Sequence, residues 1–131
     1  MAAELLWAAA GALQAQSFPN RPIKLVVGFA PAGAADFVAR TLGEPLSRGL
    51  GQPIVIDNRP GAGSSIAAEY VAKSAPDGYT VLIASPSSIL VNPLMMKLGY
   101  DAKRDLVPVS KVSSSTRWRR VSLVRSWSSA R

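Results

Sequence analysis

The sequence predicts an α/β fold in which helices flank a parallel sheet. Between residues 23 and 84, short apolar runs of strand length alternate with segments of helical period. Glycine, proline, serine or aspartate separates them, as in turns. Such an alternation favours parallel strands joined by right-handed crossovers. The 131 residues are enough for about one domain of this kind.

The first strand and helix are predicted by a change of period. Residues 23–29 are a β-branched apolar run, and residues 37–50 carry an apolar stripe at helical spacing. Asp36 immediately precedes that stripe, so its carboxylate is expected to cap the helix. Pro45 removes a helical donor and is expected to kink or shorten the helix.

The next elements follow in the same order. A second strand is predicted at residues 54–57, and a third, almost wholly apolar strand at residues 79–84. Between them, Ser64 or Ser65 is expected to cap a short helix that ends near Ala72. The three strands would then have their carboxyl ends at one edge of the sheet.

Composition excludes several kinds of chemistry. The chain has no cysteine and no histidine, so a disulfide, a thiolate metal site and a Ser/His/Asp triad are ruled out. We expect no catalytic residue, no metal and no cofactor. A site built on backbone groups is therefore favoured over one built on reactive side chains.

The net charge of +7 comes almost wholly from one end of the chain. Residues 1–110 hold nine basic and eight acidic residues, whereas residues 111–131 hold six basic residues, seven serines and no acid. This tail has no packing pattern and is predicted to be disordered or out of frame. The alternative is a phosphate-binding arm around Arg117 and Trp118. Because the balanced body has no basic face to extend such an arm, nucleic acid is not an expected partner.

Residues 1–17 resemble an imperfect secretory signal peptide. The apolar run 5–13 has the length of an h-region, and cleavage is expected near Ala15. Glu4 stands in the region where basic residues are usual, so an alanine-rich helix end is the alternative. No stretch reaches the roughly 18 apolar residues that span a membrane.

Three loops are expected at the carboxyl edge of the sheet, where parallel sheets bind ligands. They are residues 30–35, 59–64 and 85–88, and all are rich in small residues and proline. Small residues let a ligand approach the backbone, and the N–H groups at a helix N-terminus favour carboxylate or phosphate. The loops therefore predict a site for a small anion.

A dinucleotide site is the alternative at the same loops. Residues 28–33 match G-x-A-x-x-G after a strand, and Asp57 ends the second predicted strand, where a ribose-binding acid would lie. This pattern would make the chain part of a nucleotide-dependent, Rossmann-like enzyme. Against it, Ala30 replaces the glycine nearest the pyrophosphate, and Pro31 removes an N–H donor.

Five ordered motifs carry a resemblance to a known family. The motifs are FPNRPI at 18–23, VGFAPAGAAD at 27–36, NRPGAG at 58–63, APDGYT at 75–80, and a last stretch from Asn92-Pro93 to Ser110. Together they resemble the start of the Bug family, the extracytoplasmic solute-binding receptors of tripartite tricarboxylate transporters. The resemblance covers residues 18–110 and stops where the basic tail begins.

The resemblance implies a fold and a function. Residues 18–110 would form part of the first lobe of a two-lobed, type II-like periplasmic binding protein. Such receptors are periplasmic and bind small carboxylates without turnover, delivering them to a membrane permease, and we expect a monomer. Family members are much longer than this chain. It is therefore expected to be an N-terminal fragment without useful affinity alone.

The resemblance also implies which residues bind the ligand. Backbone N–H groups of the first loop would hold one carboxylate, partly through water, while the third loop would add hydroxyl groups and backbone donors. The expected residues are Phe29, Ala32, Gly33, Ala34, Asp36, Ser85, Ser87 and Ser88.

The chain departs from the family pattern in these loops. Ala32 stands where glycine is usual, Ala35 where serine or threonine is common, and Ser64-Ser65 where Gly-Asn is common. A methyl group at position 32 would crowd the ligand. Alanine at position 35 removes a hydroxyl that would anchor water.

Deleting residues 111–131 should leave the melting temperature and circular dichroism of the body unchanged, because these residues have no packing pattern. Thermal melts of the full chain and of a chain ending at Ser110 check this. Loss of helix or strand signal in the shorter chain would show that the tail docks on the body.

Overall fold

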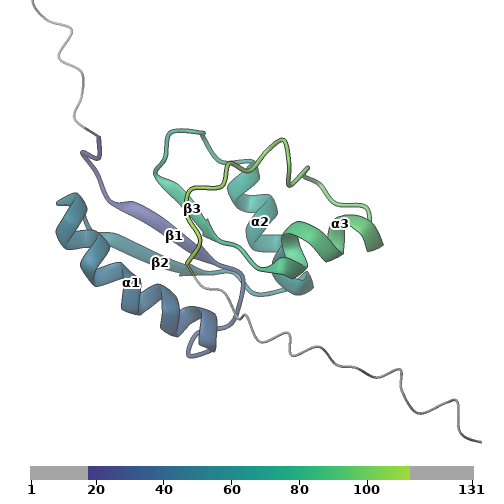
Figure 1. Cartoon of the computed structure of the whole chain (residues 1–131), viewed down its shortest axis with the longest axis horizontal. Coiled ribbons are helices and arrows are strands. Elements are labelled where there is room, and N and C mark those ends of the chain that lie inside the picture. The colour runs from purple at the N-terminus through teal and green to yellow at the C-terminus, as the bar shows by residue number, and fades with distance from the viewer. Residues whose placement is uncertain (1–17, 113–131) are drawn as a thin grey trace, which may run out of the picture.

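The computed structural model describes residues 18–112, which form a parallel sheet with helices on both faces (Figure 1). This confirms the expected fold class. The expected signal peptide and residues 113–131 of the tail lie outside the described residues. The strands are β1 (Ile23–Val27), β2 (Ile54–Asn58) and β3 (Thr80–Ile83), and their order in the sheet is β2-β1-β3.

The three strands end level at one edge of the sheet. Val27, the last residue of β1, pairs with Asn58 of β2 and with Ile83 of β3, which are the last residues of their own strands. The segments that follow the strands therefore start side by side. β1 ends two residues earlier than predicted, which leaves Gly28 and Phe29 to the first loop.

The first helix, α1 (Ala34–Leu50), covers one face of β1 and β2. Its Ala39 is fully buried in a cluster with Leu25 and Val27 of β1. Because successive strand residues point to opposite faces, Leu25 and Val27 lie on the same side of the sheet. Partly buried apolar side chains complete this core: Ala35, Ile54, Ile56, Val81 and Ile83.

Pro45 does not shorten α1, so that part of the expectation is wrong, whereas the expected helix end near Leu50 is confirmed. The helix continues to Leu50 and ends at Gly51, whose φ of 67° is the left-handed conformation common after a helix. The donor that Pro45 lacks would have bonded the carbonyl of Thr41. Both residues are exposed, so solvent can replace that donor.

The second helix, α2 (Ser65–Ala72), covers the other face of the sheet (Figure 1). Its Ala67 and Ala68 are fully buried. Their small side chains let the helix lie close to the strands. Val26, a β1 residue that points to this face, is also fully buried.

A helical segment follows β3 where the sequence predicts only a loop. Ser-Pro-Ser-Ser is typical of turns, but π-helical structure begins at Ser87 as η3 (Ser87–Val91) and leads directly into α3 (Asn92–Met95). The prediction of a loop throughout 85–88 is therefore wrong for its second half. Among residues 18–112, no helix has both the length and the hydropathy of a membrane span.

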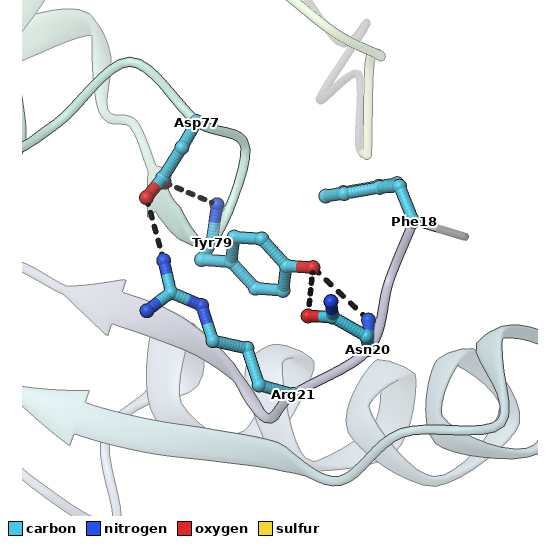
Figure 2. Close-up of a pocket in the computed structure, with 5 residues that line it drawn as sticks. All are labelled: Phe18, Asn20, Arg21, Asp77 and Tyr79. Carbon is cyan, nitrogen blue, oxygen red and sulfur yellow. Dashed lines mark hydrogen bonds and ion pairs between the residues drawn. The ribbon is translucent and has the colours of Figure 1, made fainter. Parts of the chain in front are cut away.

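The amino edge of the sheet is fastened by a cluster around Tyr79 (Figure 2). The ring of Phe18 meets the Tyr79 ring edge-on, with 5.0 Å between centroids, and the guanidinium carbon of Arg21 lies 4.2 Å from the Tyr79 centroid. Arg21 also forms a 2.7 Å ion pair with Asp77. The backbone N–H of Asn20 donates to the Tyr79 hydroxyl, which donates to the Asn20 side chain. The first and fourth sequence motifs thus fasten to each other at the edge opposite the expected binding loops.

Candidate functional site

An open cavity of about 590 Å³ lies at the carboxyl edge of the sheet, over the loop that follows β1. Seven consecutive residues line it, from Phe29 to Ala35. The largest is Phe29, which is 39% exposed, and the others are alanine, glycine and proline. A ligand here would meet backbone and small apolar side chains. Of the expected binding residues, the cavity brings together Phe29, Ala32, Gly33 and Ala34.

The backbone N–H groups of this loop are not all available to a ligand. The N–H of Ala32 donates to the Asp36 carboxylate at 2.9 Å, and that of Gly33 makes a long, 3.4 Å bond to the Ala30 carbonyl. Ala34 and Ala35 begin α1, so their N–H groups have no acceptor within the helix. The best placed donors are therefore those of Ala34 and Ala35, beside the positive end of the α1 dipole.

Asp36 is not the cap of α1, and that expectation is wrong. Gly33 is the N-cap residue, and Asp36 is the third residue of the helix. From this position an acidic side chain reaches back to the backbone before the helix. Its carboxylate does so at the N–H of Ala32, and it also accepts from Arg40 Nε at 2.9 Å and from Asn58 Nδ2 at 3.0 Å. Asp36 lies beneath the loop and does not line the cavity.

The surroundings of Asp36 keep it ionised. The hydrogen bond from Arg40 is the main cause that lowers the pKa of Asp36, and the Ala32 N–H adds to it. Together with Asn58 they bring the pKa from 3.8 to about 2. The carboxylate thus stays negative near neutral pH, and the adjacent Arg40 balances its charge.

Sequence reasoning missed Asn58 and Arg40. Asn58 ends β2, and its Nδ2 donates both to Asp36 and to the Phe29 carbonyl, at 3.1 Å for the latter. It thereby joins the end of β2 to the first loop and to the start of α1. The i, i+4 spacing of Asp36 and Arg40 is a recognisable helical ion pair and could have revealed Arg40. No local pattern reveals Asn58, because its partners lie 22 and 29 residues away.

Ser64 brings the second loop into contact with the first loop at Gly28. The Ser64 side chain lies directly over Gly28, where an added Cβ would fall 1.8 Å from its hydroxyl oxygen. Ser64 does occupy the N-cap position of α2, but its φ of 73° is left-handed and its side chain makes no capping bond. Within the described residues, this buried hydroxyl has no hydrogen-bond partner. Neither Ser64 nor Ser65, the first residue of α2, caps the helix as expected.

The hydroxyl groups of the third loop bond one another instead of lining the cavity. Ser88 is fully buried, and its hydroxyl donates to the Ser85 carbonyl at 3.1 Å. Its backbone N–H makes a long bond to the Ser85 hydroxyl. Ser87 is half-buried beside Gly63, where an added Cβ would lie 3.6 Å from the Ser87 Cβ. None of these three serines therefore lines the cavity, and Ser87 adjoins the second loop.

The described residues offer little support for a dinucleotide site or a metal site. Asp57, the expected ribose-binding acid, is paired with Arg59 at 2.9 Å. Across residues 18–112, no group of three or more acidic side chains could hold a metal ion. The geometry that remains is an open, backbone-lined cavity at a helix N-terminus.

Comparison with known proteins gives one family. A model described as the tripartite tricarboxylate transporter family receptor matches residues 38–128, so the match runs past the last motif into the basic tail. The chain is 48% identical over 113 residues to a UPF0065 protein of Bordetella bronchiseptica, covering 86% of this chain and 34% of that protein. It is 46% identical over 105 residues to the protein BugT of Bordetella pertussis, covering 79% and 32%. The chain thus spans about a third of the length of these relatives.

Solved structures of similar fold also resemble this chain in sequence. One described as a periplasmic transporter superposes with a TM-score of 0.63 at 42% identity, covering 66% of this chain and 29% of that one. Rpa4515 of R. palustris, solved with adipate, has a TM-score of 0.59 at 42% identity, with 66% and 29% covered. MatC from Rhodopseudomonas palustris, solved with bound malate, has a TM-score of 0.59 at 37% identity, with 67% and 30% covered.

Replacing Ser64 by glycine should raise the free energy of unfolding by about 1 kcal/mol. The change removes a left-handed serine, which costs about 1–2 kcal/mol, and an unpaired buried hydroxyl, against a backbone entropy cost of about 0.5–1 kcal/mol. Urea unfolding measures the difference. The matched control is Ser65→Gly, at a helical φ of −68° with a bonded hydroxyl, which should destabilise the protein. Equal losses in the two variants would contradict the strain at Ser64.

The three donors around Asp36 should make folding stability depend on acid pH. The pKa of Asp36 is lower in the folded chain, about 2 against 3.8, so its stabilisation is present above pH 3.8 and is lost as pH falls toward 2. Urea unfolding at several pH values should show a shallower loss for Asp36→Asn than for the unsubstituted chain. Glu44→Gln is the control, because the Glu44 side chain is 78% exposed. An unchanged slope in Asp36→Asn would refute the assignment.

Proposed function

We propose that this chain, which belongs to the tripartite tricarboxylate transporter receptor family, forms one wall of a receptor site for a small carboxylate. The cavity over Phe29–Ala35, open to the first N–H groups of α1, carries this proposal. Backbone donors beside a helix dipole attract a carboxylate without supplying any group for chemistry on it. The role is therefore that of a binding protein and not of an enzyme.

The charges near the cavity support an anionic ligand. The nearest carboxylate, Asp36, lies behind the loop and bonds Arg40, so the pair brings little net charge. The positive end of the α1 dipole therefore remains the main local field at the cavity. The side chains that line the cavity are all uncharged.

Malate and adipate are the natural probes. The related MatC was solved with bound malate and Rpa4515 with adipate, and both structures share the fold of this chain. Both molecules present a carboxylate to any pair of N–H donors. We propose small dicarboxylates as the ligand class, a periplasmic location, a monomeric state, and a membrane permease as the partner that receives the ligand.

One wall alone should bind weakly. Two charge-assisted bonds contribute about 1.5–3 kcal/mol each, against an association cost of at least about 4 kcal/mol. The best case leaves about 2 kcal/mol, or a dissociation constant on the order of tens of millimolar. Tighter binding needs a second wall, and the relatives have about twice as much additional chain from which to form it.

Titrating the isotope-labelled full chain with sodium malate or adipate should shift the amide signals of Ala34 and Ala35 in NMR spectra. Sodium chloride at matched ionic strength is the reference. The test variant is Ala34→Pro, which removes one donor. Proline is well tolerated at the first helical position, and the extended Gly33 before it (φ −80°, ψ 171°) suits proline.

Ala34→Pro should keep the fold and lose the ligand-induced shifts, whereas Ala35→Ser should keep them, because it retains both donors and adds a hydroxyl. Carboxylate shifts that persist unchanged in Ala34→Pro would refute the proposed site. Shifts caused only by a nicotinamide dinucleotide, and abolished by Asp57→Ala, would favour the nucleotide-dependent enzyme instead.

A further inference from the structure

A cluster of buried polar residues lies beneath the second and third loops. Its members are Ser65, Ser88, Asn92 and Tyr100, and none is more than 9% exposed. They come from the start of α2, from η3, from the start of α3 and from the segment after α3. None of them lines the cavity over Phe29–Ala35.

Asn92 holds the second loop from below. Its side-chain nitrogen donates to the Ser65 hydroxyl at 2.7 Å and to the Ala62 carbonyl at 2.9 Å, with the Gly63 carbonyl farther away at 3.4 Å. A Cβ added to Gly63 would lie 3.0 Å from the same nitrogen. The amide group is therefore in close contact with the loop backbone.

Tyr100 links the third loop to Ser65, the residue that Asn92 also contacts. Its hydroxyl donates to the Ser88 carbonyl at 2.6 Å and lies 3.5 Å from the Ser65 hydroxyl. Ser65 is thus contacted by both Asn92 and Tyr100. Through it, the backbone at residues 62–65 is connected to the backbone at Ser88.

The second loop needs such support because its backbone is strained. Four consecutive residues have positive φ: Gly61 at 132°, Ala62 at 46°, Gly63 at 59° and Ser64 at 73°. Ala62 and Ser64 are not glycines, and non-glycine residues keep such conformations only where the surroundings over-determine them. The Asn92 amide supplies that constraint. Ser64, the last residue of the strained run, lies directly on Gly28, the residue before the cavity.

We propose that Asn92 and Tyr100 are positioning residues of the carboxylate site. They hold the second and third loops in the shape that supports the first loop, and so set the affinity of the cavity without touching the ligand. This inference rests on the proposed function. It also explains why Asn92 and Tyr100 belong to a sequence motif although neither reaches the cavity.

The test compares Tyr100→Phe with Tyr70→Phe in the full chain. Each change deletes one tyrosine hydroxyl that makes a hydrogen bond, since the Tyr70 hydroxyl accepts from Lys24 at 3.0 Å. Tyr70 lies near the end of α2, and its ring, which Tyr70→Phe retains, contacts Arg59 at the start of the second loop. Tyr70→Phe leaves the contacts of the Tyr100 hydroxyl with Ser65 and Ser88 intact, so the two variants should differ at the binding edge. Asn92→Ser, which replaces the amide side chain with a shorter hydroxyl side chain, is the second test variant.

Hydrogen exchange without ligand gives the first readout. Tyr100→Phe and Asn92→Ser should speed amide exchange at residues 61–64 and 85–88, whereas Tyr70→Phe should not. The malate titration gives the second, and both test variants should bind about threefold to tenfold more weakly, because each change removes hydrogen bonds that hold the loops. Tyr70→Phe should retain the parent affinity.

The possible outcomes separate the two proposals. Carboxylate shifts that are absent from the unsubstituted chain overturn the proposed function. Shifts of equal strength in the parent, Tyr100→Phe and Asn92→Ser overturn the positioning role alone. Exchange that rises equally in all three variants, throughout the sheet, would show that the two residues contribute only general stability, which also overturns the role.

Discussion

Asp36 is 3% exposed, and its carboxylate takes hydrogen bonds from the loop before α1, from α1 itself and from the end of β2. Burying an ionised carboxylate is costly unless donors satisfy it. Here Ala32, Arg40 and Asn58 supply three. Because these donors belong to three separate segments, none of the segments can move without leaving the charge unsatisfied. The shape of the cavity above them depends on that requirement.

Apolar patterning was sufficient to predict the sheet, because each strand is a short run of β-branched residues between turns. It could not distinguish an aspartate at the N-cap from one at the third helical position, since both lie at the start of a helix and both favour an acid. The structure separates them through Gly33, which takes the cap position and frees Asp36 to reach backward. The prediction was correct in placing Asp36 at the start of the helix and wrong in its partner.

The residues that line the cavity were predictable on the first loop, whereas the direction of the serines on the third loop was not. The first loop is a contiguous segment that ends in a helix, so its exposed N–H groups follow from local order along the chain. The serines of the third loop offered hydroxyl groups but no indication of their direction. Ser88 turns inward because the segment continues as η3 and because Tyr100, twelve residues later, bonds its carbonyl. Such a contact depends on tertiary packing, which no local pattern specifies.

The backbone conformation explains the importance of two departures from the family pattern. Ala32 and Ser64 stand where the family commonly has glycine, and both have left-handed φ, 65° and 73°. Glycine adopts that conformation without steric cost, whereas alanine and serine do not. The sequence shows that these positions differ, and the backbone shows why glycine suits them.

The aromatic cluster around Tyr79 and the cavity lie at opposite ends of β1, a strand whose five residues extend about 17 Å. A group attached at Phe18 itself would therefore lie on the side of the sheet that faces away from the cavity. Tethering the protein to a surface through that side would leave the carboxyl edge directed toward solvent. Anchoring the protein at that side would therefore not obstruct the approach of a ligand to the cavity.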